Sequence, residues 1–95
     1  MSLLHGHEGR DYYAAHQYSS GHRKQIEESD LCGCFYCVTT FPPSAIEEWI
    51  DEDESGAGQT ALCPRCGVDS VIGSKAGFPL TKVFLETMHA HWFQR

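Results

Sequence analysis

Two short cysteine pairs decide the fold: Cys34-Phe35-Tyr36-Cys37 and Cys63-Pro64-Arg65-Cys66. Each pair has the C-x-x-C spacing at which a tight turn directs two sulfurs at one tetrahedral metal ion. Backbone N–H groups of such a turn also hydrogen-bond the thiolates. Pro64 suits the start of the turn, and Gly67 supplies the positive φ that lets the chain double back. The two pairs therefore predict a structural site for one Zn²⁺ per chain, bound by Cys34, Cys37, Cys63 and Cys66.

The size of the chain makes such a site valuable. The chain has 95 residues, and we expect residues 1–19 to be a mobile N-terminal segment in which His5 and His7 belong to a solvated tail. Residues 20–95 then form one domain of about 75 residues, for which hydrophobic burial alone gives marginal stability. Structural zinc contributes on the order of 10 kcal/mol in small finger peptides, so the metal would decide whether this domain folds.

Charge and cysteine usage restrict the classes of function. Seven Lys and Arg stand against thirteen Asp and Glu, a formal net charge of −6. This balance argues against binding to a nucleic-acid backbone, which needs clustered basic residues. The sequence shows neither an apolar run of membrane-spanning length nor a secretory leader, so we expect a cytoplasmic protein with no membrane partner. Five cysteines cannot all pair as disulfides within one monomer, which favours metal-binding thiolates.

Four helices are expected along the chain. The first two cover residues 11–18 and 22–29, the second with Ser19 or Ser20 as N-cap. Ser44 and Glu47 form an S-x-x-E capping box, which predicts a helix. Ile46, Trp49 and Ile50 would share one apolar face of this helix. The helix would also account for the length of the segment between the cysteine pairs, which exceeds the roughly 15–20 residues of the usual template. The acidic run 51–54 would end this helix as a solvated charge run. Thr81 caps a last helix over 82–93, in which Phe84, Met88 and Trp92 recur every four residues with Leu85 beside them.

The strands are expected around the two cysteine turns, which we call knuckles. Residues 31–41 are rich in aromatic and β-branched residues and end at Pro42-Pro43, which suits a knuckle leading into a strand. Residues 60–62 and 68–72 flank the second knuckle and read as the two strands of a short hairpin. The predicted fold class is α+β: a small zinc-ribbon or treble-clef-like domain with two knuckles, a β-hairpin and three to four short helices.

The stretch from Ser29 to Gly73 resembles a family of small uncharacterised bacterial cytoplasmic proteins. The shared motifs are GCFYC, TALCP-x-C and DSVIG. This resemblance covers about half of the chain closely and implies a four-cysteine zinc-binding domain. The two cysteine pairs also resemble the ligand layout of zinc ribbons, of treble-clef fingers and of rubredoxins, in which iron replaces zinc. Rubredoxins have a second knuckle similar to Cys63–Gly67, but their first knuckle usually continues with glycine, where this chain has Val38.

The fifth cysteine, Cys32, leaves the ligand assignment open. It stands two residues before Cys34, and a C-x-C spacing needs a different turn from that of a standard knuckle. We take Cys34 and Cys37 as the first ligand pair. The alternatives pair Cys32 with Cys37 or with Cys34. Outside the site, Cys32 is either a redox-active thiol or, as is commoner for cysteine, a small buried apolar residue.

Three functions are consistent with these observations. In the first, the metal is structural and the protein binds another protein or itself, because four sulfur ligands leave no position for a catalytic water. In the second, a treble-clef scaffold of the HNH type carries a metal-dependent nuclease or hydrolase built from His22, Asp69, His89 and His91. His89 and His91 are two residues apart on a helix and point in different directions, which argues against that enzyme. In the third, the site holds iron and transfers electrons. We favour the first, without an enzymatic activity.

Overall fold

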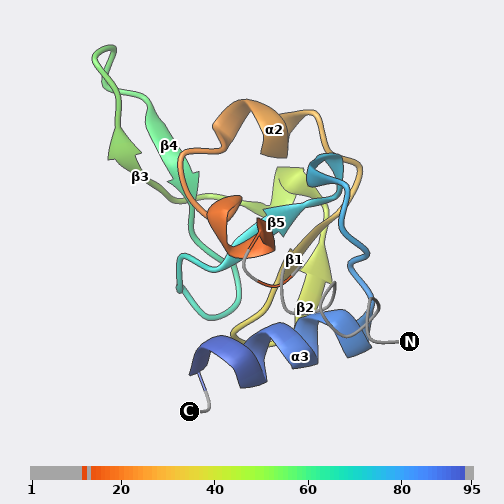
Figure 1. The fold of residues 1–95 in the computed structure, drawn as a ribbon. Coiled ribbons are helices and arrows are strands. Elements are labelled where there is room, and N and C mark those ends of the chain that lie inside the picture. Colours follow the sequence, from red (N-terminus) through yellow and green to blue (C-terminus); the bar gives the residue numbers. More distant parts are fainter. Residues whose placement is uncertain (1–11, 13, 94–95) are drawn as a thin grey trace.

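The computed structural model describes residue 12 and residues 14–93. Within this part, residues 14–17 are helical, and the other elements follow along the chain as shown in Figure 1. They are α2 (Arg23–Glu27), β1 (Cys32–Cys34), β2 (Thr39–Phe41), the 3-10 turn η1 (Pro43–Ala45), β3 (Trp49–Glu52), β4 (Gly58–Ala61), β5 (Val71–Gly73), the 3-10 turn η2 (Ser74–Ala76) and α3 (Lys82–Phe93).

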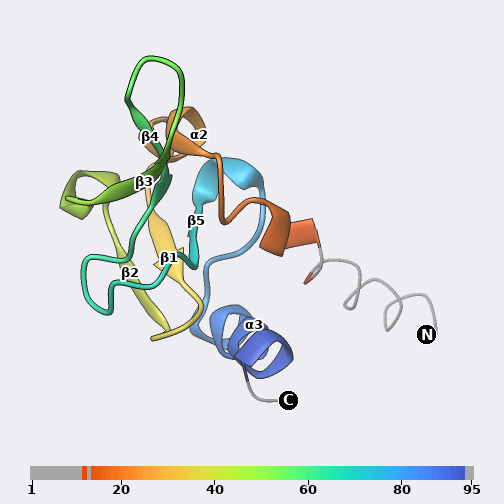
Figure 2. The same ribbon diagram turned by 90° about the vertical axis from the view of Figure 1, so that its left-hand side faces the viewer.

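The described strands form a three-stranded antiparallel sheet in the order β2-β1-β5 and a separate β3–β4 hairpin. Cys34, at the end of β1, lies opposite Thr39 on one side and Val71 on the other. Both ribbon views place α3 at the opposite end of the molecule from the β3–β4 hairpin (Figures 1 and 2). Short helices and antiparallel strands in one small unit confirm the α+β class.

Two clusters of buried side chains pack the core. One gathers Ile26 of α2 with Cys32, Phe41 and Val71. The other gathers Phe35 and Ile72 with Leu85 and Met88 of α3. Val71 and Ile72 are neighbours on β5 and belong to different clusters, because successive side chains of a strand point to opposite faces. The small sheet is therefore buried on both faces.

The last helix is as predicted. α3 spans Lys82–Phe93, and its first turn is capped where the backbone N–H of Phe84 donates to the Thr81 hydroxyl at 3.1 Å. Phe84, Leu85 and Met88 are buried and Trp92 is half-buried. Twelve residues with an apolar stripe at helical spacing suffice to define this element locally.

The helix predicted from Ser44 is wrong. Pro43–Ala45 makes one 3-10 turn, Ile46 is already extended at φ −75° and ψ 125°, and Trp49–Glu52 is a strand. Six residues are too few for a helix to form without help from packing, and pairing with β4 gives the backbone of β3 its hydrogen bonds instead. Successive side chains of a strand point to opposite faces, so Trp49 is half-buried and Ile50 is 39 % exposed, while Ile46, which precedes the strand, is buried. The acidic run 51–54 belongs to this strand and the turn after it.

The hairpin predicted around the second knuckle is also wrong. β4 pairs with β3, and β5 pairs with β1. The tight turn after β3 explains this choice: one carboxylate oxygen of Asp53 accepts hydrogen bonds from the backbone N–H groups of Ser55 at 2.8 Å and Ala57 at 3.2 Å. An Asx-type turn brings β3 and β4 together at little cost in loop-closure entropy.

The N-terminal prediction holds in part. α2 lies within the predicted range, but His22 precedes it in place of a serine cap, and Ser19 Oγ donates backward to the carbonyl of His16. Residues 14–17 are helical within the expected 11–18, and Ala15 is fully buried among the side chains of the second cluster. The boundary at residue 19 stays a prediction. Most of segment 1–19, with His5 and His7, lies outside the described residues.

Candidate metal centre

The two knuckles make the same backbone turn. In each, the N–H two residues after the first cysteine donates to that cysteine's sulfur: Tyr36 to Cys34 at 3.4 Å and Arg65 to Cys63 at 3.4 Å. The residue after the second cysteine has a positive φ in both turns, 57° at Val38 and 79° at Gly67. The predicted C-x-x-C turn therefore forms twice, although a β-branched residue occupies the left-handed position of the first.

Strand pairing brings the two knuckles together. Cys34 ends β1 and Cys37 precedes β2, so the first knuckle is the turn of a hairpin. Cys63 follows β4, and Cys66 precedes β5, which pairs with β1. The backbone N–H of Phe35 donates to the carbonyl of Ser70 at 3.1 Å, which extends this pairing into the first knuckle. β1 and β5 together thus position both cysteine pairs.

The four sulfurs converge on one point. Cys34, Cys37, Cys63 and Cys66 have their Sγ atoms within 4.8 Å of one another. Cys34 and Cys66 are 3.7 Å apart, as are Cys37 and Cys63. Four thiolates at about 2.3 Å from a tetrahedral ion are about 3.8 Å apart, whereas a disulfide needs about 2.05 Å. All five cysteines are free thiols. The donor set and its spacing fit a tetrahedral thiolate-bound metal ion.

Two hydroxyl groups also contact the first cysteine pair. Ser70 Oγ lies 3.1 Å from Cys34 Sγ, and Thr39 Oγ1 lies 3.1 Å from Cys37 Sγ. When these cysteines are thiolates, the hydroxyls are the donors, and they spread part of the negative charge of the sulfurs. Neither hydroxyl is among the site residues predicted from the sequence. Thr39 stands two residues after Cys37 and is detectable from spacing, whereas Ser70 reaches Cys34 only through the pairing of β5 with β1.

Burial opposes ionisation of the thiols when no cation is near. Burial raises the pKa of the Cys34 thiol, and the hydrogen bond with Ser70 partly offsets this effect. Burial likewise raises the pKa of Cys66. At Cys63 burial also acts to raise the pKa, but hydrogen bonds, first that from the Arg65 N–H, bring it below its usual value. A bound dication supplies the positive charge that keeps such thiols ionised. The cluster is therefore suited to a metal ion and poorly suited to four free thiolates.

Cys32 lies outside this group of four. It is fully buried in β1 within the first core cluster. Burial raises the pKa of its thiol to about 11, so the sulfur stays protonated at neutral pH and is a poor nucleophile. This environment fits a role for Cys32 as a small buried apolar residue and not as a redox-active thiol.

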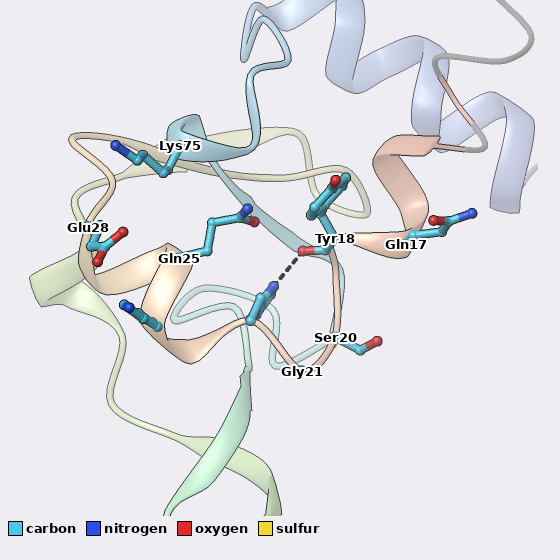
Figure 3. A pocket seen from close by; sticks show the side chains of 9 residues that line it. Gln17, Tyr18, Ser20, Gly21, Gln25, Glu28 and Lys75 are labelled. Carbon is cyan, nitrogen blue, oxygen red and sulfur yellow. Dashed lines mark hydrogen bonds between the residues drawn. The ribbon is translucent and has the colours of Figure 1, made fainter.

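The structure does not gather the residues considered for a second catalytic site. His22 is buried beneath an open pocket of about 610 Å³ and donates from Nδ1 to the carbonyl of Tyr18, the dashed bond in Figure 3. Its Nε2 accepts from the backbone N–H of Ala61, so both ring nitrogens are used internally. His89 Nδ1 bonds the carbonyl of Phe35, and Asp69 is exposed in a loop. Within residues 14–93, no hydrogen bond or ion pair joins His22, Asp69 and His89 to one another.

His91, the last residue considered for that site, is half-buried, and the centroid of its ring lies 5.9 Å from that of Tyr12.

Comparison of the chain with protein-family models, curated proteins and solved structures finds no match. None of the helices within the described residues is long and apolar enough to span a membrane.

Proposed function

We propose that the four cysteines bind one Zn²⁺ and that this metal holds together a small zinc-ribbon or treble-clef-like domain whose role is to bind protein surfaces in the cytoplasm. The convergence of four sulfurs carries the proposal. A metal ion with four thiolate ligands has no open coordination position, so it contributes folding energy and supplies no activated water.

Zinc is preferred over iron because of the first knuckle. A tetrahedral group of four sulfurs fits both metals. Val38 occupies, at φ 57°, the left-handed position for which the rubredoxin pattern uses glycine. A β-branched residue is costly there, which marks a departure from that pattern. The two metals are easily distinguished, because an iron site of this type is red and a zinc site is colourless.

A role in protein binding is supported by the surface. Several large apolar side chains are exposed although the core is well packed, among them Tyr36 at 43 % and Phe93 at 42 %. These two lie in contact with each other, and contiguous exposed apolar groups mark interaction sites more often than isolated ones do.

Metal analysis combined with thermal melts tests the proposal. Purified protein is expected to contain one zinc per chain by elemental analysis and to be colourless. Removal of the metal by a chelator should abolish the cooperative melt, and added Zn²⁺ should restore it. A metal-free protein that melts as the loaded one does would rule out a structural metal, and visible absorption with bound iron would replace zinc by iron.

A further inference from the structure

Three aromatic rings form one exposed patch where the first knuckle meets the end of α3. We call Tyr36, His89 and Phe93 the knuckle–helix patch. The rings of Tyr36 and Phe93 meet edge to face with centroids 4.9 Å apart. His89 lies 5.7 Å from Tyr36 and 5.5 Å from Phe93. Neighbouring Phe35 anchors the patch, because its own ring is buried and lies 5.8 Å from that of Phe93. The patch is therefore fixed to the core and open on its outer side.

Among the described residues, one hydrogen-bond donor and one acceptor of the patch have no partner. His89 Nδ1 lies 3.2 Å from the carbonyl of Phe35, which only accepts, so Nδ1 bears the proton and Nε2 is left as an acceptor. The Tyr36 hydroxyl is a donor without a partner among the described residues. A second copy of the same patch, related by a twofold axis, offers each of these groups its complement: Tyr36 of one copy to His89 of the other, twice.

The distribution of charge favours a second copy at this end of the molecule. Residues 47–54 contain six acidic residues and no basic one, and the rest of the chain has seven acidic and seven basic residues. The whole formal charge of −6 thus resides in the segment that leads into and forms the β3–β4 hairpin. This hairpin lies at the end of the molecule opposite α3 (Figures 1 and 2). If two copies are joined through α3, their acidic hairpins lie far apart. Exposed charges separated by more than the Debye length are largely screened by salt, so the hairpins would repel each other little.

We propose that the knuckle–helix patch is the contact surface of a symmetric homodimer. The aromatic rings exclude water at its centre, and the two Tyr36–His89 hydrogen bonds set its register. This inference rests on the proposed role in protein binding and specifies the partner as a second copy of this chain. It also gives Tyr36 a reason to be exposed in a turn whose other features serve the metal.

Sedimentation equilibrium of the zinc-loaded full chain tests the dimer. Measured between about 10 μM and about 1 mM, the chain is expected to reach twice its mass of 10.6 kDa with a micromolar dissociation constant. Tyr36→Phe removes only the hydroxyl and leaves the backbone bond to Cys34 in place. It should raise the dissociation constant about tenfold or more, because two symmetry-related hydrogen bonds are lost. Phe93→Ser should leave a monomer.

Two exposed apolar residues outside the patch provide matched controls. Val83 is 70 % exposed on the first turn of α3, and Ile50 is exposed on the hairpin. Val83→Ser and Ile50→Ser should each leave the dissociation constant within about twofold. A monomer over the whole range, or a dimer that Tyr36→Phe leaves unchanged, overturns the inference. So does a dimer that Ile50→Ser dissociates.

Zinc content and the thermal melt of each variant separate this inference from the proposed function. A monomer with one zinc and a cooperative melt refutes only the dimer and leaves the structural metal in place. A dimer that melts identically with and without zinc refutes the structural role of the metal and leaves the dimer in place.

Discussion

The two knuckles make the same turn, yet the chain anchors them differently. The first sends Phe35 into the core, lies between paired strands and places a hydroxyl group against each of its two sulfurs. The second exposes Pro64, Arg65 and Gly67, and its strand β4 pairs with β3 in the projecting hairpin. C-x-x-C spacing therefore specifies the turn, while strand pairing decides how rigidly the turn is supported.

The largest expected effect is shared by both knuckles. Cys34→Ser and Cys63→Ser should each abolish zinc binding and unfold the domain, with loss of most of the roughly 10 kcal/mol that structural zinc provides. Elemental analysis and thermal melts measure this. Cys32→Ser is the matched control and should keep full zinc content with a change of only about 1–2 kcal/mol, because its sulfur is buried outside the site. Equal melts for Cys32→Ser and Cys63→Ser would contradict the ligand assignment.

The residues with positive φ should distinguish the knuckles. Gly67→Val places a β-branched residue at φ 79° in a turn with little packing around it, and should cost about 2–3 kcal/mol in the free energy of unfolding. Val38→Gly relieves the same strain at φ 57°, which stabilises the fold. It also loses packing against the second core cluster and raises the entropy of the unfolded chain, and both of these effects destabilise the fold. Its net effect should be within about 1 kcal/mol. Denaturant unfolding measures both variants, and a Val38→Gly variant less stable than Gly67→Val would contradict this expectation.

The hydroxyl groups should make the first knuckle sensitive to small changes. Ser70→Ala removes a buried donor to Cys34 and should weaken zinc affinity about tenfold or more. Thr39→Val removes the donor to Cys37, which is only half-buried, and should weaken it by less. Competition with a chromophoric chelator measures both affinities. Ser74→Ala, on η2 and bonded to the N–H groups of Asp30 and Leu31, controls for loss of a hydroxyl away from the metal. An equal loss of affinity in that variant would show that the effect is not local.

The smallest effect concerns pH and the strand that leads into the second knuckle. Burial lowers the pKa of His22 below its usual 6.5, and its neutral Nε2 accepts from Ala61 of β4. The neutral form is favoured in the folded state, so this contribution is complete above about pH 6.5 and is lost as pH falls toward the lowered pKa. Denaturant unfolding of zinc-loaded protein between pH 7.5 and 5.5 should show the decrease. His22→Gln should lower stability at pH 7.5 and flatten this dependence, and an equally steep dependence in that variant would assign the effect to other groups.

Two segments show how far the sequence could predict the structure. Residues 82–93 and 45–50 both present apolar residues at helical spacing after a capping residue. The first has twelve residues, enough hydrogen bonds to offset the cost of starting a helix. The second is half as long, and its Trp49 and Ile50 are equally suited to a strand. The sequence places Asp53 in an acidic run that indicates only a solvated segment, but Asp53 closes the turn that gives β3 its partner.

The sequence by itself determined the cysteine set, the turn at each knuckle and the last helix, because each depends on residues within one or two turns of the chain. Tertiary structure alone decided that β5 pairs with β1, that Ser70 meets Cys34, and that Tyr36 lies exposed against Phe93. These outcomes depend on competition between strands and surfaces far apart in the sequence. Alternative strand pairings have similar energies. The observed pairing is favoured because it alone buries both core clusters and brings the four sulfurs together at one point.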